Sequence, residues 1–87
     1  DVYIDYNDRG LAKDDLGDYQ GAIEDYNEAI RLKPDYANAY YNCGNAKAAL
    51  GDYQGAINDY DESIQLGSDD VYIDYNDRGL AKDDLGD

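Results

Sequence analysis

The sequence predicts an all-α solenoid built from antiparallel helix-turn-helix units, and three observations support that fold class. Residues 1–18 and residues 70–87 are identical, both reading DVYIDYNDRGLAKDDLGD. A second motif, Asp18-Tyr19-Gln20-Gly21-Ala22-Ile23, returns 34 residues later, which is the spacing of a repeated helix pair. Leu-Gly-Asp recurs at the joints between segments whose apolar residues have a helical period. The predicted helices are about 2–16, 19–32, 36–50, 53–66 and 71–85.

Each Leu-Gly-Asp triplet is predicted to end one helix and to begin the next. Glycine is favoured just past a helix C-terminus, where a left-handed backbone is needed, and aspartate is a good N-cap. The turn is then very short, so the two helices of a unit must lie antiparallel. The triplets lie at 16–18, 50–52 and 85–87. Pro34 is expected to end the second helix and Asp35 to begin the third, whereas residues 67–70 separate the fourth from the fifth.

The second and fourth helices show the clearest amphipathic pattern. Apolar or small side chains follow one another at the i, i+3, i+4, i+7 spacing of a single helix face. In the second helix these are Tyr19, Ala22, Ile23, Tyr26, Ala29 and Ile30. In the fourth they are Tyr53, Ala56, Ile57, Tyr60, Ser63 and Ile64. The longest alternating stretch, residues 2–6, is too short to predict a strand.

Length and composition limit the possible partners. The 87 residues allow one small domain, and twenty-one acidic against seven basic side chains give a net charge of −14. Nucleic acid and anionic membranes are disfavoured, because both require clustered lysine and arginine. The single cysteine, Cys43, excludes an internal disulfide and is expected to be a small buried apolar residue. The compartment stays unknown; the lack of disulfides, membrane-spanning runs and signal-peptide pattern fits the cytoplasm if the protein is natural.

The repeated residues fall at the spacing of a known helical repeat. The first unit carries Tyr6, Gly10, Tyr19, Ala22, Tyr26, Ala29 and Pro34, and the second carries Tyr40, Gly44, Tyr53, Ala56 and Tyr60. This pattern resembles the tetratricopeptide repeat (TPR) over the whole chain. The resemblance implies one right-handed superhelical solenoid over residues 1–87, with units at about 3–36 and 37–70 and a half unit at about 71–87. It also implies a non-enzymatic scaffold for protein–protein interaction.

Small residues mark the places where helices are expected to approach closely. Gly10 and Ala22 are expected to face each other across the first helix pair, because bulk there would splay the stack. The chain departs from the family pattern just before this glycine, where Arg9 replaces a leucine. Arg9 is expected to lay its stem along the core and to pair with Asp5, one turn earlier.

The resemblance also implies a concave groove lined by the first helix of each unit, which holds a peptide or a partner helix. The groove positions would be Asn7, Asp8, Leu11, Asn38, Tyr41, Asn42, Asn45, Asn76, Asp77 and Leu80. One TPR subfamily clamps a peptide's C-terminal carboxylate there with lysine, arginine and asparagine. The matching positions in this chain are mostly aspartate and neutral residues, so a basic or neutral peptide is expected and an acidic tail is not. The alternative is that these residues form only a solvated face.

The sequence predicts no catalytic, cofactor or metal site. Histidine is absent and Cys43 has no base partner, so the usual nucleophile–base pairs cannot be built. Residues 5–10 resemble the start of a calcium loop, but the twelfth position would be Leu16, where a bidentate glutamate is needed.

The duplicated end of the chain carries its own prediction. The fifth helix copies the first but has no following helix to pair with, so it either caps the stack or couples to another molecule. Its packing residues would be Tyr72, Tyr75, Gly79, Lys82 and Leu85. The two outer copies are identical while the middle copy has diverged, which favours an engineered or designed array. A structural array that self-assembles head to tail or by helix swapping is therefore the alternative to a peptide-binding scaffold.

Overall fold

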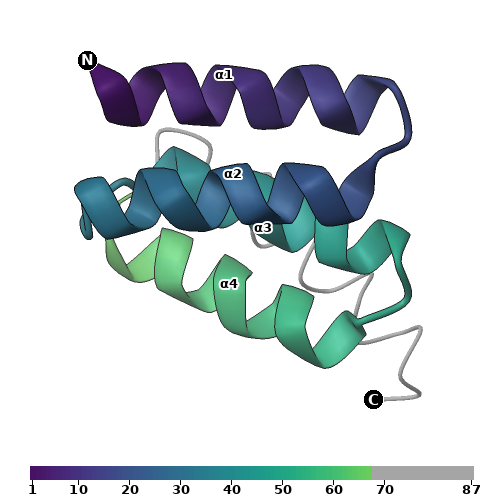
Figure 1. The fold of residues 1–87 in the computed structure, drawn as a ribbon. Helices are drawn as coiled ribbons and strands as arrows, with labels where there is room; N and C mark the ends of the chain where they lie inside the picture. Colours follow the sequence, from purple (N-terminus) through teal and green to yellow (C-terminus); the bar gives the residue numbers. More distant parts are fainter. Residues whose placement is uncertain (68–87) are drawn as a thin grey trace.

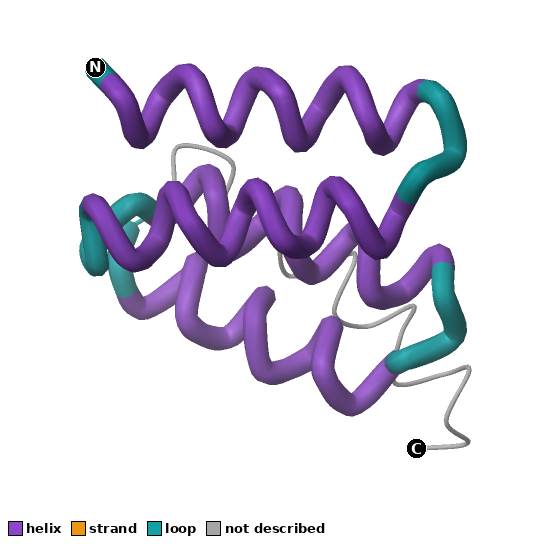
Figure 2. Tube along the Cα trace, viewed as in Figure 1, coloured by secondary structure: helices purple, strands orange, loops and turns teal. Residues whose placement is uncertain are grey.

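The computed structural model describes residues 1–67, which form four α-helices and no strand. Helix α1 spans Val2–Asp15, α2 spans Tyr19–Leu32, α3 spans Ala37–Ala49 and α4 spans Tyr53–Gln65 (Figures 1 and 2). The all-α class is confirmed, and four predicted helices agree with these bounds within one residue at each end. The fifth predicted helix lies outside the described residues.

The four helices form two antiparallel pairs that stack on each other (Figure 1). Helix α1 packs on α2 and helix α3 packs on α4, while the contact between α2 and α3 joins the pairs. Helix α1 also touches α3, whereas α4 contacts only α3 among these helices. No helix in residues 1–67 is long and apolar enough to cross a membrane.

The turn within each pair has the chemistry that Leu-Gly-Asp predicts. Gly17 has a φ of +82°, and the N–H of Asp18 donates to the Lys13 carbonyl at 2.9 Å, which closes the end of α1. The Asp18 carboxylate then accepts from the Gly21 N–H at 3.0 Å and caps α2. The same contacts recur one unit later at Lys47, Gly51, Asp52 and Gly55. One triplet therefore ends a helix, reverses the chain and starts the next helix.

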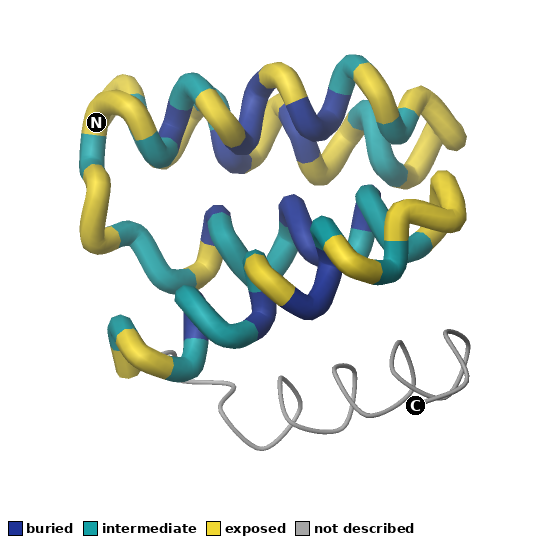
Figure 3. The backbone as a smooth tube through the Cα atoms, turned by 90° about the horizontal axis from the view of Figure 1, so that it is seen from below, coloured by how far each residue is buried: buried dark blue, intermediate teal, exposed yellow. Residues whose placement is uncertain are grey.

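The closest approach within each pair is between a glycine and a tyrosine ring. A Cβ atom on Gly10 would lie 2.5 Å from Tyr26 Cε1, and one on Gly44 would lie 2.7 Å from Tyr60 Cε1. Tyr26 is fully buried. The expectation that Gly10 faces Ala22 did not include this ring, which lies one turn further along α2; in the second pair the carbonyl oxygen of Ala56, the counterpart of Ala22, also lies 3.2 Å from a Cβ on Gly44. The buried positions lie on the helix sides that face one another (Figure 3).

The contact between the two pairs is apolar and tight. Ala22, Ile23 and Tyr26 of α2 pack with Cys43 and Ala46 of α3. Cys43 is 1% exposed, which confirms it as a small buried residue, and this burial raises the pKa of its thiol to about 12. A thiol in this setting stays protonated and contributes by packing.

The start of the third helix differs from the sequence expectation by one residue. Tyr36, not Asp35, occupies the N-cap position of α3, and its side chain makes no capping hydrogen bond. The Asp35 carboxylate instead lies 3.3 Å from Lys33 Nζ. The ring of Tyr36 packs edge-on against Tyr3, with centroids 5.1 Å apart. Packing and an ion pair therefore position this junction in place of a side-chain cap.

Candidate functional site

The face of α1 assigned to a groove is partly open to solvent. Ile4 and Leu11 are 39% and 41% exposed, and the carboxylate of Asp8 lies between them in sequence and is exposed. Asp15, one turn after Leu11, is also exposed. The open part of α1 thus alternates apolar and acidic side chains, a pattern that can contact both the stem and the charge of a basic side chain.

Asn7 belongs to the same predicted set but lies inside the protein. It is 6% exposed, and its Oδ1 accepts a hydrogen bond from Asn42 Nδ2 at 3.0 Å. Burial raises the pKa of Tyr36, and the neighbouring Asn7 side chain opposes that rise. Asn7 therefore joins α1 to α3 through its buried amide oxygen.

Three of the four candidate residues of α3, Tyr41, Asn42 and Asn45, are half-buried. The Tyr60 hydroxyl of α4 donates to Asn45 Oδ1 at 2.6 Å. The Tyr41 ring lies 5.9 Å from the Tyr60 ring, tilted by 45°. Asn38, near the start of α3, is exposed. The structure thus brings Tyr41 and Asn45 together around Tyr60, and leaves Asn38 open.

The first pair satisfies its buried tyrosine with a different acceptor. The Tyr26 hydroxyl donates to Asp14 Oδ2 at 2.5 Å. Burial raises the pKa of Asp14, and the hydrogen bond from Tyr26 opposes that rise. Burial also raises the pKa of Tyr26, and Asp14 raises it further. Each tyrosine therefore reaches the first helix of its own unit, at an aspartate in one pair and an asparagine in the other.

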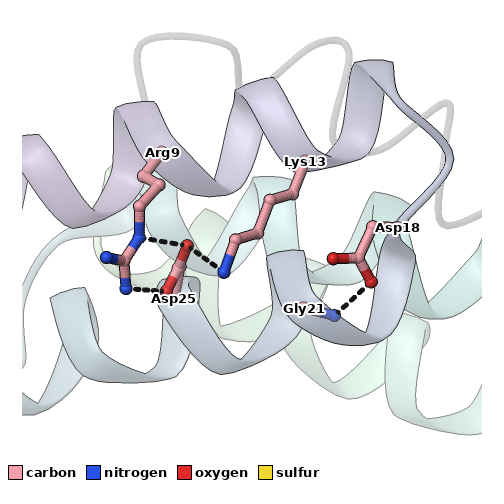
Figure 4. Close-up of polar contacts among 5 residues, drawn as sticks. All are labelled: Arg9, Lys13, Asp18, Gly21 and Asp25. Carbon is pink, nitrogen blue, oxygen red and sulfur yellow. Dashed lines mark hydrogen bonds and ion pairs between the residues drawn. The ribbon is translucent and has the colours of Figure 1, made fainter.

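A buried carboxylate on α2 collects two cations from α1 (Figure 4). Arg9 Nε and Nη2 donate to the two oxygens of Asp25 at 2.8 and 2.7 Å, and Lys13 Nζ lies 3.1 Å from Asp25 Oδ2. The bidentate contact with Arg9 holds the pKa of Asp25 below its usual value. The expected Arg9–Asp5 pair was therefore wrong: the long side chain reaches across the helix pair instead of back along α1.

Every basic side chain in residues 1–67 is paired with a carboxylate. Besides Arg9 and Lys13, the pairs are Arg31–Glu28, Lys33–Asp35 at 3.3 Å and Lys47–Asp59 at 2.8 Å. The pair on α4 involves a single cation, because the buried Asp59 Oδ2 lies 2.8 Å from Lys47 Nζ and no second basic side chain is within ion-pair distance in residues 1–67. Fourteen acidic and five basic residues give this part of the chain a net charge of −9. The described surface therefore offers unpaired carboxylates and no unpaired cation.

Comparison with known proteins identifies the repeat. Profiles described as "TPR repeat" and "Tetratricopeptide repeat" match residues 10–51 and residues 37–70, respectively. The chain belongs to the tetratricopeptide repeat family. A solved structure titled "First TPR of Spaghetti (RPAP3) bound to HSP90 peptide SRMEEVD" superposes with a TM-score of 0.91 at 25% identity, covering 98% of this chain and 67% of that one. No curated protein sequence matches the chain.

Tetratricopeptide repeat proteins are generally non-enzymatic interaction scaffolds, and this TPR chain is a scaffold for protein interaction. Within residues 1–67, no three His, Cys, Asp or Glu side chains converge to hold a metal ion. Candidate residues of the half unit lie outside the described residues: Tyr72, Tyr75, Asn76, Asp77, Gly79, Leu80, Lys82 and Leu85. The candidate groove residues that the structure describes therefore all lie on α1 and α3.

Sequence reasoning missed the residues that hold this face together. Tyr26 and Asp25 were not assigned roles at the face, yet their contacts with Asp14, Arg9 and Lys13 fix how α1 sits on α2. A signal was present in the unit-to-unit alignment, because Asp14 and Leu11 of the first unit correspond to Ala48 and Asn45 of the second. The second unit lacks the aspartate and has an asparagine in place of the leucine, so each unit keeps one hydrogen-bond acceptor for its buried tyrosine, Tyr26 or Tyr60.

Proposed function

We propose that this TPR protein binds an extended neutral or basic peptide along the exposed faces of α1 and α3. In this proposal successive units coil into a right-handed superhelix, and α1 and α3 line its inner surface. The observation that carries the charge preference is the complete pairing of cations in residues 1–67, beside the exposed carboxylates Asp8 and Asp15. An incoming lysine or arginine would find acceptors that no basic side chain of this part already occupies.

The exposed apolar residues supply the second half of the surface. Ile4 and Leu11 are both partly exposed and lie about two turns of helix apart, with Asp8 between them. Peptide side chains that lie between them would bury apolar surface and gain affinity. The amides of Asn38 and Asn42 are placed on the neighbouring helix, where they could hydrogen-bond a peptide backbone. Asn42 uses its Nδ2 on Asn7, so its Oδ1 is the atom proposed to receive a peptide N–H.

The structural neighbour binds SRMEEVD, an acidic peptide, and the same ligand fits this chain poorly. Carboxylate clamping requires lysine or arginine, and in residues 1–67 those side chains are already paired with carboxylates. An acidic tail over α1 would lie against Asp8 and Asp15 and be repelled. The proposal therefore keeps the peptide-binding surface and reverses its charge preference.

A titration with two short peptides tests this proposal. The full chain, labelled with 15N, is titrated with a lysine-rich heptapeptide whose ends are blocked and with its glutamate counterpart. The lysine peptide should shift the amide signals of Asp8, Leu11 and Asn38, and the glutamate peptide should not. A nonspecific effect of the net charge would shift exposed acidic residues everywhere, including Glu24 on α2.

Two matched variants separate the site from the overall charge. Asp8→Asn and Glu24→Gln each remove one exposed carboxylate, so both change the net charge by the same amount. Asp8→Asn should raise the Kd of the lysine peptide about threefold to fivefold, and Glu24→Gln should change it much less. Equal effects of the two substitutions would reject the site on α1.

Self-association remains the second candidate function, and a specific observation favours it. Residues 70–87 repeat residues 1–18 without a change, so each chain carries the same 18-residue sequence twice. A surface that accepts one copy within a chain can accept the other copy from a second chain.

A further inference from the structure

The two helix faces proposed to bind a peptide differ in their chemistry. On α1 the exposed positions alternate apolar and acidic side chains, whereas their counterparts on α3, one unit later, carry amides or a methyl group. The residues of α1 are Ile4, Asp8, Leu11 and Asp15, and their counterparts on α3 are Asn38, Asn42, Asn45 and Ala49. None of the four side chains on α3 is charged, so the surface changes from acidic to neutral on passing from α1 to α3.

These two faces lie side by side in the structure. The hydrogen bond of 3.0 Å between Asn7 and Asn42 joins the helices directly, and Asp8 follows Asn7 in the chain. Burial raises the pKa of Tyr36 at the start of α3, and the charge of Asp8 raises it further, so this carboxylate lies close to the neighbouring helix. Helices in contact have axes about 8–10 Å apart, a distance that about three residues of an extended peptide span. One short peptide can therefore touch both faces.

The basic residues of the two units do not cancel the difference in charge. Arg9 and Lys13 of α1 are paired with Asp25, and no ion pair in residues 1–67 includes Asp8 or Asp15. The first unit therefore presents two unpaired carboxylates to a ligand, and the second unit presents none at the equivalent positions.

On the basis of the proposed function, we propose that the ligand is a peptide of two parts, with a basic segment over α1 and an uncharged polar segment over α3. A lysine or arginine over α1 would lay its stem against Leu11 and place its charge at Asp8 or Asp15. A serine, threonine or glutamine over α3 would hydrogen-bond the amide of Asn38. A lysine over α3 would be partly desolvated without a carboxylate beside it. The order of residues in the peptide then matters as well as its composition.

Two spin-labelled peptides test this order on the full chain labelled with 15N. Both consist of three lysines followed by four serines with blocked ends, and they differ only in which end carries a nitroxide amino acid. Given the spacing of the helices, the lysine-end label should broaden the amide signals of Asp8 and Leu11 about twofold more than those of Asn38 and Asn45. The serine-end label should give the opposite ranking.

The failure of this inference can be told apart from the failure of the proposed function. If neither peptide shifts an amide signal of α1 or α3, the proposed function is rejected and the order of segments with it. If the peptides bind but each label broadens the signals of both helices equally, the peptide surface stands and the inference is overturned.

An exchange of charge between the two helices should reverse the result. One variant combines Asp8→Asn with Asn38→Asp and Asp15→Ala with Ala49→Asp, four exposed positions, and keeps the composition, mass and net charge of the chain. The Kd of the peptide should change less than about twofold, because the number of carboxylates is the same. The lysine-end label should now broaden the signals of α3 more than those of α1. An unchanged ranking, in a variant whose circular dichroism shows intact helices, would overturn the inference.

A matched exchange away from the two faces is the control. Glu24→Gln combined with Gln54→Glu moves one carboxylate from α2 to α4 at exposed positions, again with no change in composition or net charge. This variant should leave the Kd and the ranking of the signals unchanged, because salt screens a distant charge. A reversed ranking in this control would mean that the overall field of the chain orders the peptide, and would also overturn the inference.

Discussion

The two helix pairs share their packing and differ in how they satisfy buried polar groups. Both turns use the same glycine and aspartate, and in both a tyrosine ring lies against a helical glycine. The first pair holds Asp25 with Arg9 and Lys13, whereas the second holds Asp59 with Lys47 alone. Position in the stack explains this difference: the counterpart of Arg9 on α3 is Cys43, which is buried against α2.

This comparison separates what a repeat must keep from what it can change. Turn geometry and ring-on-glycine packing act within one pair, so they recur unchanged. Polar contacts depend on whether another helix covers the outer side of the first helix. Where α1 is open, a long charged side chain fits, and where α3 is covered, only a small one does.

The glycine contact is expected to give the largest effect. Gly10→Ala and Gly44→Ala each place a methyl group against a tyrosine ring, and overpacking of this kind costs about 1–3 kcal/mol. The better helix propensity of alanine returns about 1 kcal/mol of this. Both variants should lose stability, because in each the new Cβ would lie less than 3.0 Å from two carbons of the ring. Urea unfolding measures both, and equal stability of both variants with the unaltered chain would contradict the packing account.

The buried aspartates should show the difference between the pairs. Asp25→Asn removes a carboxylate that accepts from two cations, and should cost about 1–2 kcal/mol. Asp59→Asn should cost less, since that carboxylate is paired with Lys47 alone among the basic residues of the described part of the chain. Urea midpoints at neutral pH compare them, and a larger loss for Asp59→Asn would reverse the ranking argued from the contacts.

Acid titration sharpens the same comparison. The pKa of Asp25 is lower in the folded chain than in the unfolded one, mainly because of Arg9. Its contribution to stability is therefore complete above the unfolded value of about 3.9, and is lost as the pH falls through the folded value. Asp25→Asn should flatten the fall in stability below about pH 4. An acid limb that is as steep in the variant would show that other carboxylates control it.

The glycine and the arginine also show how far the sequence could lead. The helix bounds and the turns were predictable, because the hydrophobic period and the capping residues act between neighbours in the sequence. The pairing of Arg9 with Asp25 and the tyrosine ring against Gly10 were not predictable, because the spacing of residues along α1 shows which of them are neighbours on that helix and not what the facing helix places there. Asn7 was assigned to an open groove for the same reason: its partner, Asn42, is 35 residues away. The groove assignment itself stays a prediction.

A double-mutant cycle can convert the tyrosine contact of the first pair into that of the second. Asp14→Ala leaves the buried Tyr26 hydroxyl without its acceptor, and should cost about 1 kcal/mol. Leu11→Asn supplies an amide at the position that Asn45 has in the second pair. Combined with Asp14→Ala, it should recover about half of the loss, measured as coupling in urea unfolding. Additive effects would mean that an amide at position 11 cannot reach the hydroxyl.

The smallest expected effect lies in the last turns of the two first helices. Asp15 ends α1 at a position that is Ala49 in α3, and a carboxylate near a helix C-terminus opposes the helix dipole. Asp15→Ala should therefore stabilise the chain by about 0.3–1 kcal/mol, and Ala49→Asp should destabilise it by a similar amount. Because the interaction is exposed, added salt should shrink both differences. Thermal melts at low and moderate salt measure this, and differences that are independent of salt would assign the effect to helix propensity instead of charge.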